Sequence, residues 1–285
     1  MTALAARAPG KVNLCLFVGE PRADGLHPLV SLVQPVSLAD DVVMEPAGDR
    51  DEVVCAGVPG PNLAAAAIAA FRAATGWDAP PQRLTITKRV PVAAGMGGGS
   101  ADAAAALRLA SHGAVPADEL RRIAFGIGAD VPAQVEPRRA LMLDAGERVE
   151  PVADPEPFAL VVVPPADPLS TADVYRTADA LGHTRPHAEL AELEAAVRAA
   201  ARGGAPLPRE LAVNDLQAAA RSLRPAIDAA LAALEDADHA LVSGSGPTVF
   251  GVYAGAARAA AAARHIPRAV VAAPVGRDFA AVRPA

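Results

Sequence analysis

Apolar and polar positions along the chain alternate between strand-like and helix-like stretches. The run Val12–Val18 is apolar with few breaks, which predicts a buried strand. The segment RLTITKRV, which ends at Val90, has the period-two alternation that is typical of a strand. Between them, LAAAAIAAFRAA has helical composition, with Asn62 placed to cap its start and Gly76 just beyond its end. The first half of the chain is therefore expected to mix strands and helices.

The second half continues this alternation after a change in composition. Proline and acidic residues cluster in EPVADPEP (Glu150–Pro157), which favours a domain junction. We therefore expect one domain over residues 1–153 and another over residues 154–285. Beyond the junction, FALVVVP is strand-like, and helices are expected at His187–Arg202 and Pro208–Glu235. The pattern then gives a strand, a glycine turn and a strand in HALVSGSGPTVFGVYAG, followed by a helix and a last strand.

Composition narrows the class of protein. The chain has 285 residues, 52% of them hydrophobic, and a net charge of −6, which is typical of a folded globular protein. The acidic balance without a basic run argues against a nucleic-acid binder. Cys15 and Cys55 are too few for a disulfide framework and are expected to be small core residues. The apolar run before Arg7 is too short for a signal peptide, and no run reaches the ~18 residues of a membrane span, so we expect a cytoplasmic protein without membrane partners.

A glycine-rich loop stands between the predicted strand at Val90 and an alanine-rich helix. The stretch VPVAAGMGGGSADAAAALRLA places four glycines within five positions, directly before Ser100. Glycines let backbone N–H groups turn towards one point, and a helix N-terminus adds a positive dipole end, so this arrangement predicts an anion site. A Walker loop is excluded because no Lys-Ser/Thr follows the glycines. The loop is also a poor dinucleotide-binding fingerprint, because Ser100 stands where that motif needs its third glycine. The alternative to an anion site is a tight turn between strand and helix that binds no ligand.

Lysine is rare in this chain. Of 26 basic residues, only Lys11 and Lys88 are lysines, and the others are arginines. A lysine that persists against such a bias marks a position where an ammonium serves better than a guanidinium. Lys88 and Arg89 stand together at the end of their strand, where we expect a solvated pair, and the alternative is that they shape the field around the phosphates.

Three segments together resemble a known pattern. APGKVNL (Ala8–Leu14), the loop Pro91–Ala101 and SGSGPTVFG (Ser243–Gly251) occur in the order of the motifs of the small-molecule kinases named for galactokinase, homoserine kinase, mevalonate kinase and phosphomevalonate kinase. RADGLHPLVSLVQPVSLADDV (Arg22–Val42) and GIGADVP (Gly126–Pro132) resemble the branch whose acceptor is a cytidine diphosphate-linked methylerythritol. The resemblance covers essentially the whole chain.

This resemblance implies a fold and a reaction. The fold would be α+β with two domains, the N-terminal one like ribosomal protein S5 domain 2 and the C-terminal one ferredoxin-like. The reaction would move the γ-phosphoryl group of ATP to the 2-hydroxyl of the acceptor, on the non-mevalonate route to isoprenoid precursors. ATP and Mg²⁺ would be required, and the protein would work as a monomer or homodimer.

The resemblance also assigns the nucleotide site. The loop would offer its N–H groups to the phosphates of ATP, and Ser100 would also reach Mg²⁺ bound to ATP. Asn62 would lie near the adenine, although helix capping explains it equally well. The residues expected to bind ATP are Asn62, Pro91, Val92, Ala93, Ala94, Gly95, Met96, Gly97, Gly98, Gly99, Ser100 and Ala101.

Asp130 and Lys11 match the catalytic pair of these kinases. Asp130 would accept or orient the proton of the acceptor hydroxyl, and the charge of Lys11 would act beside it. A turn aspartate before Val-Pro is the alternative for Asp130, and a solvated strand-end lysine is the alternative for Lys11.

The acceptor would contact Asn13, Leu26, His27 and Thr248 by the same resemblance. Leu26 is a departure, because the family has a tyrosine there whose ring stacks on the cytosine. Packing of the C-terminal turn is an equal explanation for Thr248. Two other functions stay open from the sequence: a sibling kinase with another small alcohol as acceptor, and a non-catalytic nucleotide-binding protein.

Overall fold

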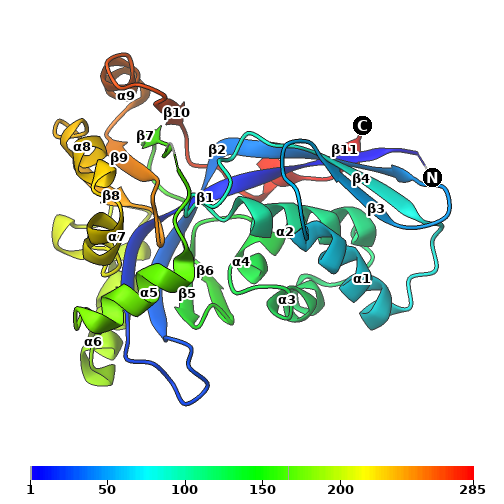
Figure 1. Ribbon diagram of the computed structural model, residues 1–285, viewed down its shortest axis with the longest axis horizontal. Helices are drawn as coiled ribbons and strands as arrows, with labels where there is room; N and C mark the ends of the chain where they lie inside the picture. Colours follow the sequence, from blue (N-terminus) through cyan, green and yellow to red (C-terminus); the bar gives the residue numbers. More distant parts are fainter. Residues whose placement is uncertain (1, 166) are drawn as a thin grey trace.

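The computed structural model describes residues 2–165 and 167–285, which form two sheets with helices packed against them (Figure 1). The first sheet has seven strands in the order β11-β1-β2-β4-β3, and β5 pairs with β2 and with β6. All its pairs are antiparallel except β3 with β4. Its strands are β1 (Leu4–Val18), β2 (Leu29–Pro46), β3 (Glu52–Cys55), β4 (Gln82–Thr87), β5 (Ala140–Asp144), β6 (Arg148–Pro151) and β11 (Arg283–Pro284).

The hairpin of β1 and β2 is the longest feature of this sheet (Figure 1). One end of β2 pairs with β4 over residues 41–46, and its other end pairs with β5 over residues 29–33. The β1–β2 register shifts between Pro9 and Lys11 and again between Asn13 and Cys15. These bulges bend the strand where Lys11 and Asn13 lie, which is a common way to re-aim side chains.

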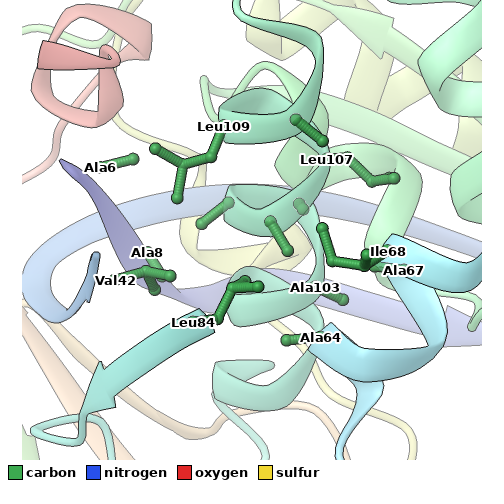
Figure 2. Packing of buried hydrophobic residues seen from close by; sticks show 14 of the residues in the cluster. Ala6, Ala8, Val42, Ala64, Ala67, Ile68, Leu84, Ala103, Leu107 and Leu109 are labelled. Atoms are coloured by element: carbon green, nitrogen blue, oxygen red, sulfur yellow. The ribbon is translucent and has the colours of Figure 1, made fainter. Parts of the chain in front are cut away.

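Four helices cover one face of the first sheet, namely α1 (Leu63–Thr75), α2 (Gly98–Ser111), α3 (Ala117–Phe125) and α4 (Val131–Val135). The side chain of Asn62 caps α1 by accepting a hydrogen bond from the backbone N–H of Ala64 at 2.8 Å, and Gly76 ends the helix at φ 67°, as the sequence predicted. The alanines of α2 allow close packing because they add little bulk. Figure 2 shows α2 between α1 and the strands, through contacts among Ala6, Ala8, Val42, Ala64, Ala67, Ile68, Leu84, Ala103, Leu107 and Leu109.

The second sheet has four antiparallel strands in the order β10-β7-β9-β8. Its succession of strand, helices, two strands, helix and strand is ferredoxin-like, so this expectation is confirmed. The elements are β7 (Ala159–Val163), α5 (Thr171–Ala180), α6 (His187–Ala201), α7 (Gln217–Leu223), α8 (Ala226–Ala232), β8 (His239–Val242), β9 (Val249–Tyr253), α9 (Ala256–Ala263) and β10 (Val270–Ala272). The expected boundary between residues 153 and 154 falls between β6 and β7 and stays a prediction.

The single helix expected over Pro208–Glu235 is wrong. The structure has a 3₁₀ turn at Arg209–Leu211 and then two short helices, α7 and α8. Asn214 interrupts the helix because its side chain accepts from Leu216 N–H and donates to the carbonyls of Val242 and Gly244. Pro225 then separates α7 from α8, since proline cannot donate to a helical carbonyl.

Backbone hydrogen bonds tie β1 to the second half of the chain. Leu16 N–H donates to the Val213 carbonyl at 2.8 Å, and Asp215 N–H donates to the Leu16 carbonyl at 2.9 Å. The Asp215 carboxylate accepts from Val18 N–H and from the Arg185 guanidinium. The Asn214–Asp215 pair is therefore structural. No helix among residues 2–165 and 167–285 is long and apolar enough to cross a bilayer.

Candidate active site

A cleft of about 610 Å³ lies where β1, the glycine-rich loop and the start of α5 meet. The loop residues Pro91–Gly95 and Gly97–Ser100 line it, and so do Lys11, Asn13, Asn62 and Asp130. The structure thus brings together most of the residues that the sequence predicted for the site.

The glycine-rich loop turns through backbone conformations that favour glycine. Gly95 and Gly97 have φ values of 76° and 65°, and Gly97 is the residue that precedes α2. No side chain of the described residues caps α2, so the N–H groups of its first turn have no side-chain acceptor among them, and Gly97–Ser100 line the cleft. Such a helix start attracts anions. Met96 and Ala101 do not line the cleft, because their side chains are buried in the apolar cores.

The C-terminal glycine turn holds this loop from the other side. Thr248 N–H donates to the Ala94 carbonyl at 3.2 Å, and the Ser243 hydroxyl donates to the Gly95 carbonyl at 3.0 Å. Thr248 is fully buried and does not line the cleft, so its observed contact is with the loop. Gly244 and Ser245 of the same turn do line it.

Lys11 and Asp130 face each other in the cleft, with Lys11 Nζ 3.5 Å from Asp130 Oδ2. Lys11 is only 6% exposed, whereas Asp130 is 32% exposed, so the carboxylate is the more accessible of the two. Lys11 Nζ also donates to Asn13 Oδ1 at 2.7 Å, and Asn13 Nδ2 donates to the Ser31 hydroxyl at 2.8 Å. Asp130 stands before α4 but its side chain does not cap that helix, which leaves its oxygens free for other partners.

Lys88 is not solvated, which corrects the sequence-based expectation. Its side chain is 14% exposed and lines the cleft, and its ammonium donates to Asp40 at 2.5 Å and to Asp102 at 2.7 Å. Burial raises the pKa of the Asp102 carboxyl to about 7, although the Lys88 ammonium opposes this rise. Arg89 does match the expectation, since it is 60% exposed and pairs with Asp41. Lys88, Asp40 and Asp102 form a buried triad, of which Asp102 belongs to α2 and Lys88 Nζ would lie 3.3 Å from a Cβ added to Gly98 at the start of that helix.

His27 and Leu26 occupy the hairpin tip beside α5 and do not themselves line the cleft. His27 Nε2 lies 2.8 Å from Asp179 Oδ1, and its ring centroid is 5.2 Å from that of Tyr175. Leu26 is 48% exposed.

Tyr175 is a cleft residue that the sequence analysis missed. It contributes the only aromatic side chain to the part of the cleft wall formed by the described residues. Burial raises the pKa of its phenol and the charge of Asp130 raises it further, so the phenol stays protonated near pH 7. The chain has only two tyrosines, Tyr175 and Tyr253, and both follow the junction, so the sequence alone did not single out Tyr175.

Comparison with known proteins agrees with this geometry. The model of the GHMP kinases N terminal domain matches residues 62–136, and that of the GHMP kinases C terminal matches residues 193–272. A 4-diphosphocytidyl-2-C-methyl-D-erythritol kinase of Anaeromyxobacter dehalogenans is 43% identical over 276 residues, which cover 91% of this chain and 84% of that one. The enzyme of the same name from Streptomyces coelicolor is 42% identical over 255 residues, 85% of each chain.

A solved structure gives the same result. A crystal structure of 4-(cytidine 5'-diphospho)-2C-methyl-D-erythritol kinase superposes with a TM-score of 0.74 at 34% identity, covering 95% of this chain and all of that one. The two-domain α+β fold is thereby confirmed. With identities of this size over nearly the whole chain, the protein belongs to the GHMP kinases and, among them, to the family of 4-diphosphocytidyl-2-C-methyl-D-erythritol kinases.

Proposed function

We propose that this protein transfers the γ-phosphoryl group of ATP to the 2-hydroxyl of 4-diphosphocytidyl-2-C-methyl-D-erythritol. The observation that carries the proposal is the Lys11–Asp130 pair, which faces the same cleft as the uncapped start of α2. Phosphoryl transfer needs an anion cradle, a group that receives or orients the hydroxyl proton, and positive charge near the transferring group. All three lie within this one cleft.

The nucleotide would occupy the end of the cleft lined by the glycine-rich loop. Backbone N–H groups of Gly97–Ser100 would donate to the phosphate oxygens. Cys55, Val58 and Leu63 line the same end and offer an apolar wall for the adenine. Asn62 Oδ1 already caps α1, so the Nδ2 amide group of this side chain is what remains to donate to the nucleotide.

The residues present fit a magnesium ion carried by ATP. No group of three or more His, Cys, Asp or Glu side chains among residues 2–165 and 167–285 could hold a metal by itself. Mg²⁺ is commonly bound through substrate phosphates with one or two protein oxygens, here the Ser100 hydroxyl. When bound, the magnesium ion would neutralise part of the negative charge of the phosphates.

Asp130 would take the proton of the attacking hydroxyl or orient that hydroxyl towards the γ-phosphorus. Its exposure of 32% leaves it reachable by the acceptor, and no helix cap competes for its oxygens. Lys11 is held in place by Asn13 and would stabilise negative charge as the phosphoryl group moves.

The cytidine would lie towards Tyr175 and the His27 hairpin, which together offer the aromatic ring surface that Leu26 lacks. Both substrates are highly charged metabolites, and we place the reaction in the cytoplasm.

The test is an acceptor panel with ATP and Mg²⁺, followed by phosphorus NMR of the product. We expect a new phosphomonoester signal only with 4-diphosphocytidyl-2-C-methyl-D-erythritol. Turnover of homoserine or mevalonate instead would show a sibling kinase. ATP binding without turnover of any acceptor, equal in the wild type and in Lys11→Ala, would show a non-catalytic nucleotide-binding protein.

A further inference from the structure

Arg139 is a buried cation, and the residues around it are not those that line the catalytic cleft. It directly precedes β5, and its side chain, 2% exposed, lies between the two sheets among Leu14, Phe158 and Val252. Only Nη2 has a partner, the Ala205 carbonyl at 3.2 Å. Nε and Nη1 are buried without a hydrogen-bond partner among the described residues. A buried guanidinium normally has most of its N–H groups hydrogen-bonded. The unpartnered N–H groups of Arg139 therefore indicate that a bound species accepts their hydrogen bonds.

A small cavity has the Arg139 side chain in its wall. It has a volume of about 20 Å³ and is lined by Arg139, by His239, and by mostly apolar side chains and loop backbone. His239 Nε2 is also buried without a partner in the described part of the chain. Two polar side chains with unpartnered buried atoms therefore line the same cavity. No residue lines both this cavity and the catalytic cleft.

The charge of Arg139 has no carboxylate partner in the described part of the chain. No carboxylate of residues 2–165 or 167–285 lies within 4.0 Å of its guanidinium. Burial lowers the pKa of the Arg139 guanidinium, and the Cys15 thiol would oppose this only in its charged form. Burial raises the pKa of that thiol to about 12, so Cys15 is neutral near pH 7. Leaving a buried charge uncompensated costs several kcal/mol in general.

We propose that this cavity binds one small monovalent anion of halide size, chloride in the cell and in ordinary buffers. The space exceeds the ~10–15 Å³ that a single water-sized particle needs and is too small for phosphate or a carboxylic acid. Nε and Nη1 of Arg139 would donate to the ion, and His239 Nε2–H would add a third donor. Because the walls come from β1, from the 155–158 segment after β6, from the 204–207 loop and from β8 and β9, the ion would join the two sheets.

Thermal unfolding at constant ionic strength tests this proposal. In the wild type, replacing 200 mM gluconate by 200 mM chloride should raise the Tm by about 2–4 °C, because an ion bound only by the folded state stabilises it. Arg139→Met keeps the length of the side chain but removes its charge, so its Tm should be the same in both salts. Arg138→Met is the matched control, since Arg138 does not line the cavity, and it should keep the full chloride response.

Crystals grown with sodium bromide give an independent readout that does not depend on a variant folding. An anomalous bromide peak beside Arg139 Nε and Nη1 would support the site. A water in that position under bromide would overturn it. An equal chloride response in the wild type and in Arg139→Met, or no response in the wild type, would likewise overturn it.

Discussion

Gly95 and Ser243 approach each other so closely that a Cβ on Gly95 would lie 2.2 Å from the Ser243 carbonyl oxygen. The contact joins the glycine-rich loop of the first half to the glycine turn of the second half. Gly95 also has a φ of 76°, which side chains other than glycine rarely adopt. Both facts make glycine necessary at this position.

Gly95→Ala should therefore push the loop away from the turn. We expect the free energy of unfolding to fall by about 2–4 kcal/mol, and kcat to fall because the phosphate cradle is displaced. Chemical denaturation measures the first effect. Gly99→Ala is the matched control for stability, since its added Cβ would meet only Leu63 Cδ1 at 3.7 Å within a helical turn. Equal stability of the two variants would contradict the steric argument.

Asp130→Asn should remove the proton acceptor while keeping the shape of the side chain. We expect kcat to fall by about 10²–10⁴-fold with the dissociation constant of ATP nearly unchanged. Steady-state kinetics and calorimetric ATP titration separate these effects. Asp118→Asn, whose side chain is 93% exposed, is the control and should keep full activity. Retention of kcat in Asp130→Asn would remove Asp130 from the mechanism.

The buried triad of Lys88, Asp40 and Asp102 should make stability depend on pH. The folded-state pKa of Asp102 is raised from 3.8 to about 7, mainly by burial. The folded state therefore holds this proton more tightly than the unfolded state, and its stabilising contribution is lost as the pH rises from about 4 through 7. Asp102→Asn abolishes this titration. The difference in unfolding free energy, variant minus wild type, should thus increase between pH 4 and pH 8.

Urea denaturation at several pH values measures that difference. A shift of one pKa unit corresponds to about 1.4 kcal/mol, so a total change of a few kcal/mol is the upper limit. Asp41→Asn is the control for removing one carboxylate from the neighbouring position of β2, because Asp41 pairs with exposed Arg89 and is not part of the buried triad. A difference that decreases with pH would show that the ammonium of Lys88, and not burial, controls Asp102.

Tyr175→Leu should weaken acceptor binding selectively. The variant keeps apolar bulk but removes the aromatic face on the cleft wall, so we expect the KM of the cytidine substrate to rise by about 2–10-fold. The KM of ATP should stay unchanged. Tyr175→Phe retains the ring and should resemble the wild type. If both KM values rise together, Tyr175 supports the cleft as a whole and does not contact the cytidine.

Much of the site could be predicted from the sequence because it depends on local backbone chemistry. The loop with its glycines, the helix that follows, and the Asn62 and Gly76 caps all rest on short-range rules. The approach of Lys11 to Asp130 came from the resemblance to a kinase family, since nothing local brings two such distant segments together. That proximity is now observed, while the catalytic roles of both residues stay predictions.

Other features depended on contacts that no local pattern reveals. Lys88 looked like a surface lysine because it ends a strand, yet Asp40 and Asp102 reach it from β2 and α2. The interruption of the helix near Asn214 could not be predicted, because its side chain bonds to carbonyls of a turn that is distant in the sequence. Tyr175 is similar, since its place in the cleft wall follows from the packing of α5 against the β1–β2 hairpin.

The backbone bonds between β1 and residues 213–215 bear on how substrates come and go. Hinge-bending enzymes part their two lobes to admit ligands. Here such a motion would break the Leu16–Val213 and Asp215–Leu16 hydrogen bonds within the strand that also carries Lys11. These hydrogen bonds hold the two halves of the chain together on the side of the cleft away from Lys11 and Asp130. Substrates and products must therefore enter and leave through the open side of the cleft while the two sheets stay joined.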